Sequence, residues 1–229
     1  MRDFSQVAAL GPPRRAGIQQ VVILASSAVH HRFAPFRVMD FAGMPLAHVA
    51  QQTAYALLGG MGARWRHSRG VAYRAAELAG PLGVDTDLLV AAAWLHDIGY
   101  APPAVVSGFH PLDGAGYLAA RRWPPRVAGL VANHSGAVFV AAARGLDDAL
   151  AAFPDEGGVV ADALTYADQT IGPGGERVTP QDRRAEMLRR HGSVSWNARV
   201  DHVRWPYLKA VAERVEDRLA AELGAALPV

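Results

Sequence analysis

The 229-residue sequence contains no cysteine. Disulfide bonds and thiolate metal sites are therefore excluded, so any bound metal must be held by nitrogen and oxygen ligands. No apolar run reaches the ~18 residues that a membrane-spanning helix needs. A short apolar stretch at residues 21–28 superficially resembles a secretory signal, but it is brief and is followed by His30-His31-Arg32. We therefore expect a cytoplasmic protein without a membrane partner.

Lysine is almost absent, since Lys209 is the only one and arginine carries the remaining positive charge. The formal net charge is only +2, from 23 basic and 21 acidic residues. This small excess gives no strong signal for nucleic-acid binding, which usually needs a concentrated basic patch. Arginine suits bidentate capture of phosphate or carboxylate, although an alanine-rich, lysine-poor composition also follows from genome base composition. Composition alone therefore selects no partner.

Helical periodicity begins near Met44. The first apolar face is formed by Leu46, Val49, Ala50, Thr53 and Leu57. Glycine and proline divide the remaining chain, which predicts helices over residues 46–57, 64–79, 126–133, 137–152, 157–170 and 206–219, with others that start at Asp85, Pro111 and Thr179-Pro180. No convincing strand pattern occurs, so we expect an all-α, single-domain helical bundle.

Residues 1–43 show no sustained period of either kind. We expect them to form an N-terminal extension, either strand-like or loosely packed and poorly ordered, with residues 44–229 as the folded domain. A natural start at Met44 is an alternative.

The stretch Trp94-Leu95-His96-Asp97-Ile98-Gly99-Tyr100 ends an apolar run that is typical of a buried helix. Burying an imidazole beside a carboxylate costs several kcal/mol unless both groups find partners. A divalent cation suits both, because neutral histidine and ionised aspartate are good metal ligands. A solvated helix cap is the more common explanation for such a pair in isolation.

Four further residues change this interpretation: His67 before the pair, and His110, His134 and Asp168 after it. Each has a simple structural explanation on its own, as a half-exposed histidine, a helix cap or an ion-pair partner. Together they form the order His, His-Asp, His, His, Asp. Repeated nitrogen and oxygen ligands on separate helices indicate a metal centre.

That order resembles the HD-domain superfamily of metal-dependent phosphohydrolases. The resemblance runs from about Met44 to Asp168 and more loosely to the C-terminus. Its most specific parts are Leu95-His96-Asp97-Ile98-Gly99 and Tyr166-Ala167-Asp168. His110 and His134 are similar to the extra histidines of the members that hold two metals.

The resemblance implies that one ion is bound by His67, His96, Asp97 and Asp168. Asp97 would bridge to a second ion held by His110 and His134. The cofactors would be one or two divalent ions such as Mn, Fe or Mg. Asp97 and His96 are the predicted catalytic residues, and metal-activated water would cleave a phosphoester. The expected partner is a small phosphorylated substrate, and Arg69 and Arg74 are the candidate residues that bind it. The chain could also form an oligomer.

Two branches of the superfamily fit poorly. Tyr100 stands where the cyclic-dinucleotide phosphodiesterases usually have lysine, and the Gly-Tyr-Pro signature of that branch is missing. The Glu-Asp pair of the alarmone hydrolases does not follow the His-Asp motif. The substrate is therefore open among a nucleotide, a cyclic nucleotide and another phosphoester.

Two other functions compete with hydrolysis. Some proteins of this superfamily hold two irons with the same ligand order and oxidise C–H or C–P bonds, and ligand types do not separate them from hydrolases. A non-catalytic HD-fold sensor is the second alternative, although all six ligand positions are occupied here.

Several other residues receive structural interpretations. Asp162 is expected to be solvated, and Gly172-Pro173-Gly174-Gly175 is expected to form a mobile loop beside the active site. We assign no metal role to His191 or His202.

The first prediction concerns residues 1–43. A chain that begins at Met44 should be helical by circular dichroism and should bind metal, because the helical period starts there and every candidate ligand follows. An unfolded truncated chain would show that the extension belongs to the core.

Overall fold

The computed structural model describes residues 43–225, and these belong to one structural unit. Within this part of the chain the secondary structure is helical, apart from an isolated β-bridge between Ile171 and Arg177. The α-helices are α2 Leu46–Leu58, α3 Ala63–Ala79, α4 Thr86–Leu95, α5 His110–Ala120, α6 Pro125–Asn133, α7 Ala137–Arg144, α8 Asp147–Leu150, α9 Gly158–Gln169, α10 Pro180–His191, α11 Trp196–Arg199 and α12 Asp201–Ala225. Two short 3-10 helices are η1 Ile98–Tyr100 and η2 His134–Gly136. The predicted all-α fold is confirmed.

Helix boundaries agree closely with the sequence where a clear stop or cap is present. The ends of α2, α3, α6 and α9 lie within one residue of the prediction. Asp85 caps α4 as expected, since its carboxylate accepts a hydrogen bond from the backbone N–H of Leu88 at 3.1 Å. The predicted extension 1–43 lies outside the described residues except for Gly43.

One predicted helix is two. The expected helix over 137–152 ends at Arg144 and restarts at Asp147. Gly145 adopts the left-handed conformation with φ +67°, and Leu146 N–H bonds back to Ala141 O at 2.9 Å. Glycine accepts this conformation without a steric penalty, so it ends α7 where a side chain would favour continuation.

The start of the last helix was also predicted wrongly. It begins at Asp201 rather than Pro206. Proline interrupts a helix by removing one backbone hydrogen bond. Pro206 and His202, the residue four positions before it, are both exposed, so water can satisfy the carbonyl that loses its partner.

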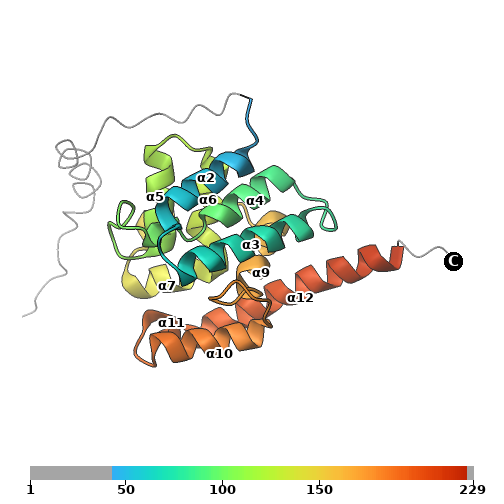
Figure 1. The fold of residues 1–229 in the computed structure, drawn as a ribbon. Coiled ribbons are helices and arrows are strands. Elements are labelled where there is room, and N and C mark those ends of the chain that lie inside the picture. Colours follow the sequence, from blue (N-terminus) through green and yellow to red (C-terminus); the bar gives the residue numbers. More distant parts are fainter. Residues whose placement is uncertain (1–42, 226–229) are drawn as a thin grey trace, which may run out of the picture. The chain divides into compact units, whose positions relative to one another are not determined.

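Helix α4 is the centre of the bundle. It packs against α2 and α3, which run beside it in Figure 1, and against α6 and α9. Leu89, Leu95 and the three alanines at positions 91–93 are fully buried. An apolar surface on all sides is the pattern of a helix enclosed by others, and α4 delivers His96 and Asp97 directly into this enclosed region.

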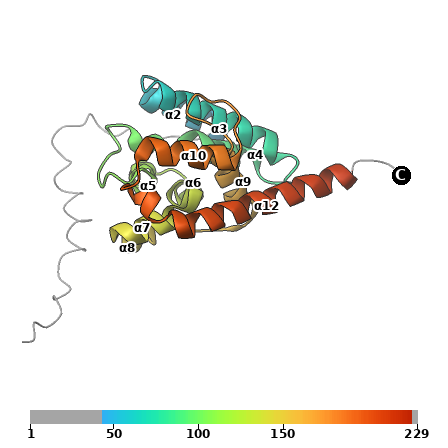
Figure 2. The same ribbon diagram turned by 90° about the horizontal axis from the view of Figure 1, so that it is seen from below.

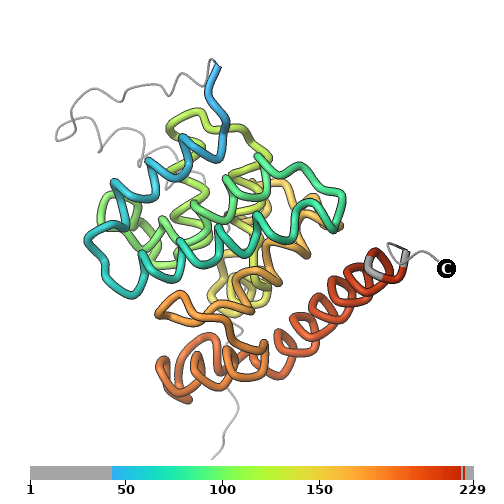
Figure 3. The backbone as a smooth tube through the Cα atoms, turned by 45° about the vertical axis from the view of Figure 1, so that its right-hand side comes forward, coloured from blue at the N-terminus to red at the C-terminus, as the bar shows by residue number. Residues whose placement is uncertain are grey.

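The C-terminal helices form a second group. Figure 2 shows α10 and α12 side by side, and both contact α9. The distal end of α12 extends past α9 in Figure 3. Asp162 on α9 is buried and accepts two hydrogen bonds from Arg214 on α12, at 2.7 and 2.9 Å. The expectation that Asp162 is solvated is therefore corrected: it joins α9 to α12.

Among residues 43–225, no helix has both the length and the apolar character needed to cross a bilayer. The cytoplasmic location stays a prediction.

The start of α2 depends on a residue of another helix. Pro45 provides no side-chain cap, and the carboxylate of Asp87 on α4 instead accepts hydrogen bonds from the backbone N–H groups of Leu46 and Ala47, at 2.7 and 2.8 Å. Helix N-termini carry unpaired donors and a partial positive charge, so a carboxylate stabilises them.

The second prediction follows from this contact. Asp87→Ala should lower the free energy of unfolding by about 1–2 kcal/mol, because two donors lose a charged acceptor. Urea denaturation at constant metal loading measures it. The exposed Asp217 on α12 is the control, and Asp217→Ala should change stability by less than about 0.5 kcal/mol. Equal effects of the two substitutions would contradict the capping role.

Candidate metal centre

Gly99 allows the beginning of α5 to approach the end of α4. The chain turns after α4 through η1, and a Cβ atom on Gly99 would lie 2.0 Å from the carbonyl oxygen of His110 and 2.7 Å from the nitrogen of Gly114. Only glycine fits this approach. As a result, His110 Nε2 lies 3.4 Å from Asp97 Oδ1.

Three buried imidazoles share one hydrogen-bonding arrangement. The Nδ1 atoms of His67, His96 and His134 face the carbonyl oxygens of Gly172, Ala93 and Val131 at 3.2, 2.7 and 2.6 Å. A carbonyl only accepts, so each Nδ1 carries the proton and donates. In the neutral ring, Nε2 is then a free lone pair directed into the site. Histidines that bind metals are commonly oriented in this way.

The six predicted ligands come together as two groups of three. His67, His96 and Asp168 form one group, and Asp97, His110 and His134 form the other, with the ligand atoms of each group within 4.8 Å of one another. All of these side chains are buried except His110, which is partly exposed. These groups could hold metal ions.

Asp97 faces both groups. Its Oδ2 lies 3.4 Å from His96 Nε2 and 3.8 Å from His67 Nε2, whereas its Oδ1 faces His110. A carboxylate whose two oxygens address separate ligand groups is placed to bridge two ions.

The chemistry of the donors fits divalent cations. The Nε2 atoms of His67 and His96 face each other at 3.4 Å. Two buried lone pairs at this separation repel unless a positive charge lies near them, and the carboxylates of Asp97 and Asp168 lie beside them. A set made only of imidazole nitrogen and carboxylate oxygen suits Mn, Fe, Zn or, less well, Mg.

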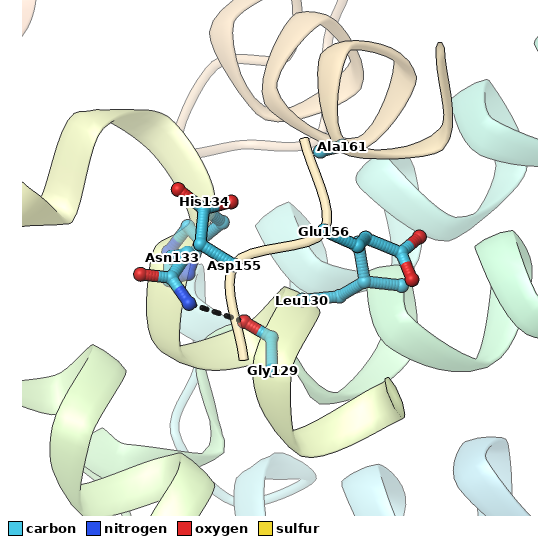
Figure 4. Close-up of a pocket in the computed structure, with 7 residues that line it drawn as sticks. All are labelled: Gly129, Leu130, Asn133, His134, Asp155, Glu156 and Ala161. Atoms are coloured by element: carbon cyan, nitrogen blue, oxygen red, sulfur yellow. Dashed lines mark hydrogen bonds between the residues drawn. The ribbon is translucent and has the colours of Figure 1, made fainter. Parts of the chain in front are cut away.

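The position of His134 is set by the end of α6. The side-chain amide of Asn133 donates to the carbonyl oxygen of Gly129 at 3.0 Å (Figure 4). Ser135 then adopts a left-handed conformation with φ +53°, which is uncommon for a residue other than glycine. The small hollow in Figure 4 includes His134 but no other candidate ligand among its described lining residues.

Ser135 also fixes Asp168. Its hydroxyl donates to Asp168 Oδ2, which further accepts a hydrogen bond from Gln169 Nε2 at 2.9 Å. The carbonyl oxygen of Ser135 accepts from Arg204 Nε at 2.8 Å. The sequence predicts only that a helix ends at residue 133, and nothing in the local pattern reveals that Ser135 contacts residues of α9 and α12.

The loop before His110 is held by Asp113. This buried carboxylate accepts hydrogen bonds from the backbone and hydroxyl of Ser107 and from Gly108 N–H, at 2.7–2.9 Å. Arg144 on α7 donates to the carbonyl oxygens of the same two residues. His110 therefore follows a loop that is fixed from two sides.

A cavity opens beside the two ligand groups, with about 500 Å³ of empty space including its open mouth. Its lining includes Asp97, His110, His134 and Asp168, together with four arginines, Arg64, Arg183, Arg190 and Arg204. His191 lines it as well, with no role as a candidate ligand.

The predicted phosphate ligands lie elsewhere. Arg69 and Arg74 are absent from the described residues that line this cavity. Arg69 is exposed, and Arg74 forms an ion pair with Glu77 at 3.1 Å and lies over the ring of Tyr166. The loop at 172–175 contributes through Gly172, whose carbonyl orients His67.

A family model for the HD domain matches residues 64–190, which is more than half of the chain and includes all six candidate ligands. The chain belongs to the HD-domain family. No curated protein and no solved structure gives a significant match. The HD-domain match ends before α11 and α12, so Asn197 and Arg204 are cavity residues that lie beyond it.

The two carboxylates of this HD domain have the protonation state that metal binding requires. Burial alone would raise the pKa of Asp97, but Arg64, 2.5 Å away, and the nearby histidines hold it well below its usual range. Burial likewise opposes ionisation of Asp168, yet its contact with His67 lowers its pKa. Both carboxylates are therefore ionised at neutral pH, as metal ligands must be.

The histidines differ from one another. Burial would lower the pKa of His96, but Asp97 outweighs burial and raises it. Burial, together with the neighbouring His96, lowers the pKa of His134 to about 4. His134 is therefore neutral at pH 7 and available as a ligand. Tyr100 is also affected, because burial and Asp97 raise its pKa to about 12 and keep its hydroxyl protonated.

The third prediction concerns acid stability of the metal-free protein. As pH falls from 6.5, the ordinary pKa of histidine, to about 4, the unfolded chain protonates residue 134 before the folded chain does. Stability from this residue is therefore intact above pH 6.5 and lost on acidification, by about 3 kcal/mol in total.

His134→Asn keeps a donor toward Val131 O and removes the titration. Urea denaturation in chelator at pH 7, 6, 5 and 4 should show a smaller acid loss in this variant than in the wild type. Parallel stability curves would contradict a lowered pKa at His134.

Proposed function

We propose that this HD-domain protein is a metal-dependent phosphohydrolase that cleaves a phosphoester of a small molecule. The family supports a metal-dependent hydrolase type of activity. The observation that carries the proposal furthest is the position of Asp97, whose two oxygens face two separate groups of candidate ligands.

One ion would be held by His67, His96, Asp97 and Asp168, and a second by Asp97, His110 and His134. When bound, such a pair of cations supplies an activated water and neutralises charge on a phosphoryl oxygen. Manganese, iron and magnesium are the expected ions.

The chain itself would orient the reaction. Arg64 lines the cavity, lies next to Asp97 and is fully charged, so it is placed to stabilise negative charge that develops on the phosphoryl group. In the overall reaction, the oxygen of water bonds to phosphorus, the bond from phosphorus to the ester oxygen breaks, and the leaving oxygen takes a proton.

Oxidation by a di-iron centre is the second candidate, because four histidines and two carboxylates serve iron as well as manganese. It predicts consumption of O₂ with an oxidised product, whereas hydrolysis proceeds without O₂.

The fourth prediction separates the roles of the ligands. The wild type should bind two ions per chain by elemental analysis. Asp97→Ala should lose both ions and reduce phosphate release to near background, because the shared negative ligand disappears. His110→Ala and His134→Ala should each lose about one ion.

His202 on α12 is exposed and is the matched histidine control, so His202→Ala should retain both ions and full activity. The assay covers nucleoside monophosphates, cyclic nucleotides and simple organic phosphates with Mn²⁺, Mg²⁺ or Fe²⁺, with O₂ uptake followed in parallel. A wild type with one ion that is insensitive to His110 would reduce the centre to a single metal. O₂ uptake with an oxidised product and no ester cleavage would favour the di-iron function.

A further inference from the structure

The C-terminal helices give the cavity a cationic wall. Helices α10 to α12 contribute Arg183, Met187, Arg190, His191, Asn197 and Arg204 to its lining. Two of these arginines have hydrogen-bond donors that have no partner among residues 43–225.

Arg183 is buried, with 8% of its surface exposed. One terminal nitrogen donates to Glu186 at 2.7 Å and the other lies 3.7 Å from Asp168. Its Nε is buried and has no hydrogen-bond partner among the described residues. A buried donor without a partner is unfavourable, and Arg183 lines the cavity, so its guanidinium is incompletely paired beside the space that a ligand would fill.

Arg204 has a similar position. Its Nε donates to the carbonyl oxygen of Ser135. Within residues 43–225, no carboxylate lies within 4.0 Å of its guanidinium, and its two terminal nitrogens donate to no described residue. A guanidinium anchored through Nε leaves its other face available for a bidentate contact with carboxylate or phosphate.

The charges in the cavity also favour an additional anion. Asp97 and Asp168 are the carboxylates of its lining, against four arginines. With both carboxylates engaged by cations, Arg204 would have no counter-ion in the lining, and Arg183 would retain only Glu186. A single phosphoryl group bound at the metal centre would therefore not neutralise the positive charge of Arg183 and Arg204.

The tyrosine and the phenylalanine of the cavity offer little for a nucleobase. Tyr100 has the guanidinium of Arg64 3.8 Å from its ring centre and the ring of His110 stacked at 4.1 Å. The other aromatic residue of the lining, Phe109, is buried, with His110 and Arg144 beside its ring. Tyr100 and Phe109 therefore present no open face on which a base would stack, which leaves only the imidazole of His191 and the arginine planes as stacking surfaces.

We propose that the substrate is a small phosphoester with a second anionic group, a carboxylate or a further phosphate, and that Arg183 and Arg204 bind this second group. The proposal rests on the proposed hydrolase function for the position of the first phosphate. It narrows the substrate class from phosphoesters in general to small dianionic or more highly charged ones without a base.

The test compares matched substrates. The first pair is 3-phosphoglycerate and glycerol 3-phosphate, which differ by a carboxylate against a hydroxymethyl group. The second pair is fructose 1,6-bisphosphate and fructose 6-phosphate, and together the pairs distinguish carboxylate from phosphate. Hydrolysis gives kcat/KM, and calorimetry on the metal-loaded full chain gives the Kd of phosphonate analogues, in which CH₂ replaces the ester oxygen.

At least one pair should show a preference of about 10-fold or more for the member with the second anion. Arg204→Gln and Arg183→Gln should each bring that preference close to one, because a charged hydrogen bond to the second anion is lost. The partner substrate with one anion should change much less. Arg189→Gln, at an exposed position of α10 outside the cavity lining, is the control and should leave both members unchanged.

Two variants on different helices guard against a folding defect, and circular dichroism and metal content must match the wild type. Equal losses for both members of each pair would show that the arginines bind the scissile phosphate, which overturns the proposal and leaves the hydrolase function intact. Tighter binding of nucleoside monophosphates than of the small substrates would also overturn it. An arginine-dependent preference in Kd without cleavage of any ester would support the anion site and reject the hydrolase.

Discussion

The buried Asp97 carboxylate is the group whose charge the surrounding residues must stabilise. An ionised carboxylate in an apolar bundle is costly unless cations and donors surround it. Here Arg64, His96, His67 and His110 all lie within 4 Å of its oxygens. The apolar α4 places Asp97 in the interior, and the glycine two residues later allows α5 to close over it.

The same constraint explains why the supporting contacts are as specific as the ligands. Each of three imidazoles has its Nδ1 hydrogen committed to a backbone carbonyl, and Asp168 is fixed by Ser135 and Gln169. These hydrogen bonds direct the Nε2 lone pairs of the histidines and the charges of Asp97 and Asp168 toward the same small region. Free energy that stabilises the rest of the bundle, including the helix caps and the apolar packing around α4, compensates for this unfavourable concentration.

Local patterns in the sequence predict much of this fold because helix periods, caps and breakers act over a few residues. The helix starts at Asp85 and at Thr179-Pro180 are recognisable in this way. Gly145 and Pro206 were misjudged because their effects depend on backbone conformation and solvent access. The six candidate ligands were recognisable through their order, which the family resemblance supplied, and the structure brings all six together.

Contacts between residues that are far apart in the sequence could not be predicted from local patterns. Arg64 is one helical turn before His67 and faces the cavity, whereas Arg74, two turns after it, faces Tyr166. Both arginines lie on the His67 side of α3, and they differ in their position along the helix, so proximity in sequence to a ligand does not identify the arginine that reaches the cavity. Ser135, Arg183 and Arg204 meet only through the packing of η2, α10 and α12, and Asp162 finds Arg214 in the same way.

The ion pair between Arg64 and Asp97 affects how the chain folds in the absence of metal. The guanidinium serves as an internal counter-ion, so the chain carries its own provisional substitute for a cation in the middle of the bundle. Folding and any binding of metal can then be separate steps, because the carboxylate has a cationic partner within the chain.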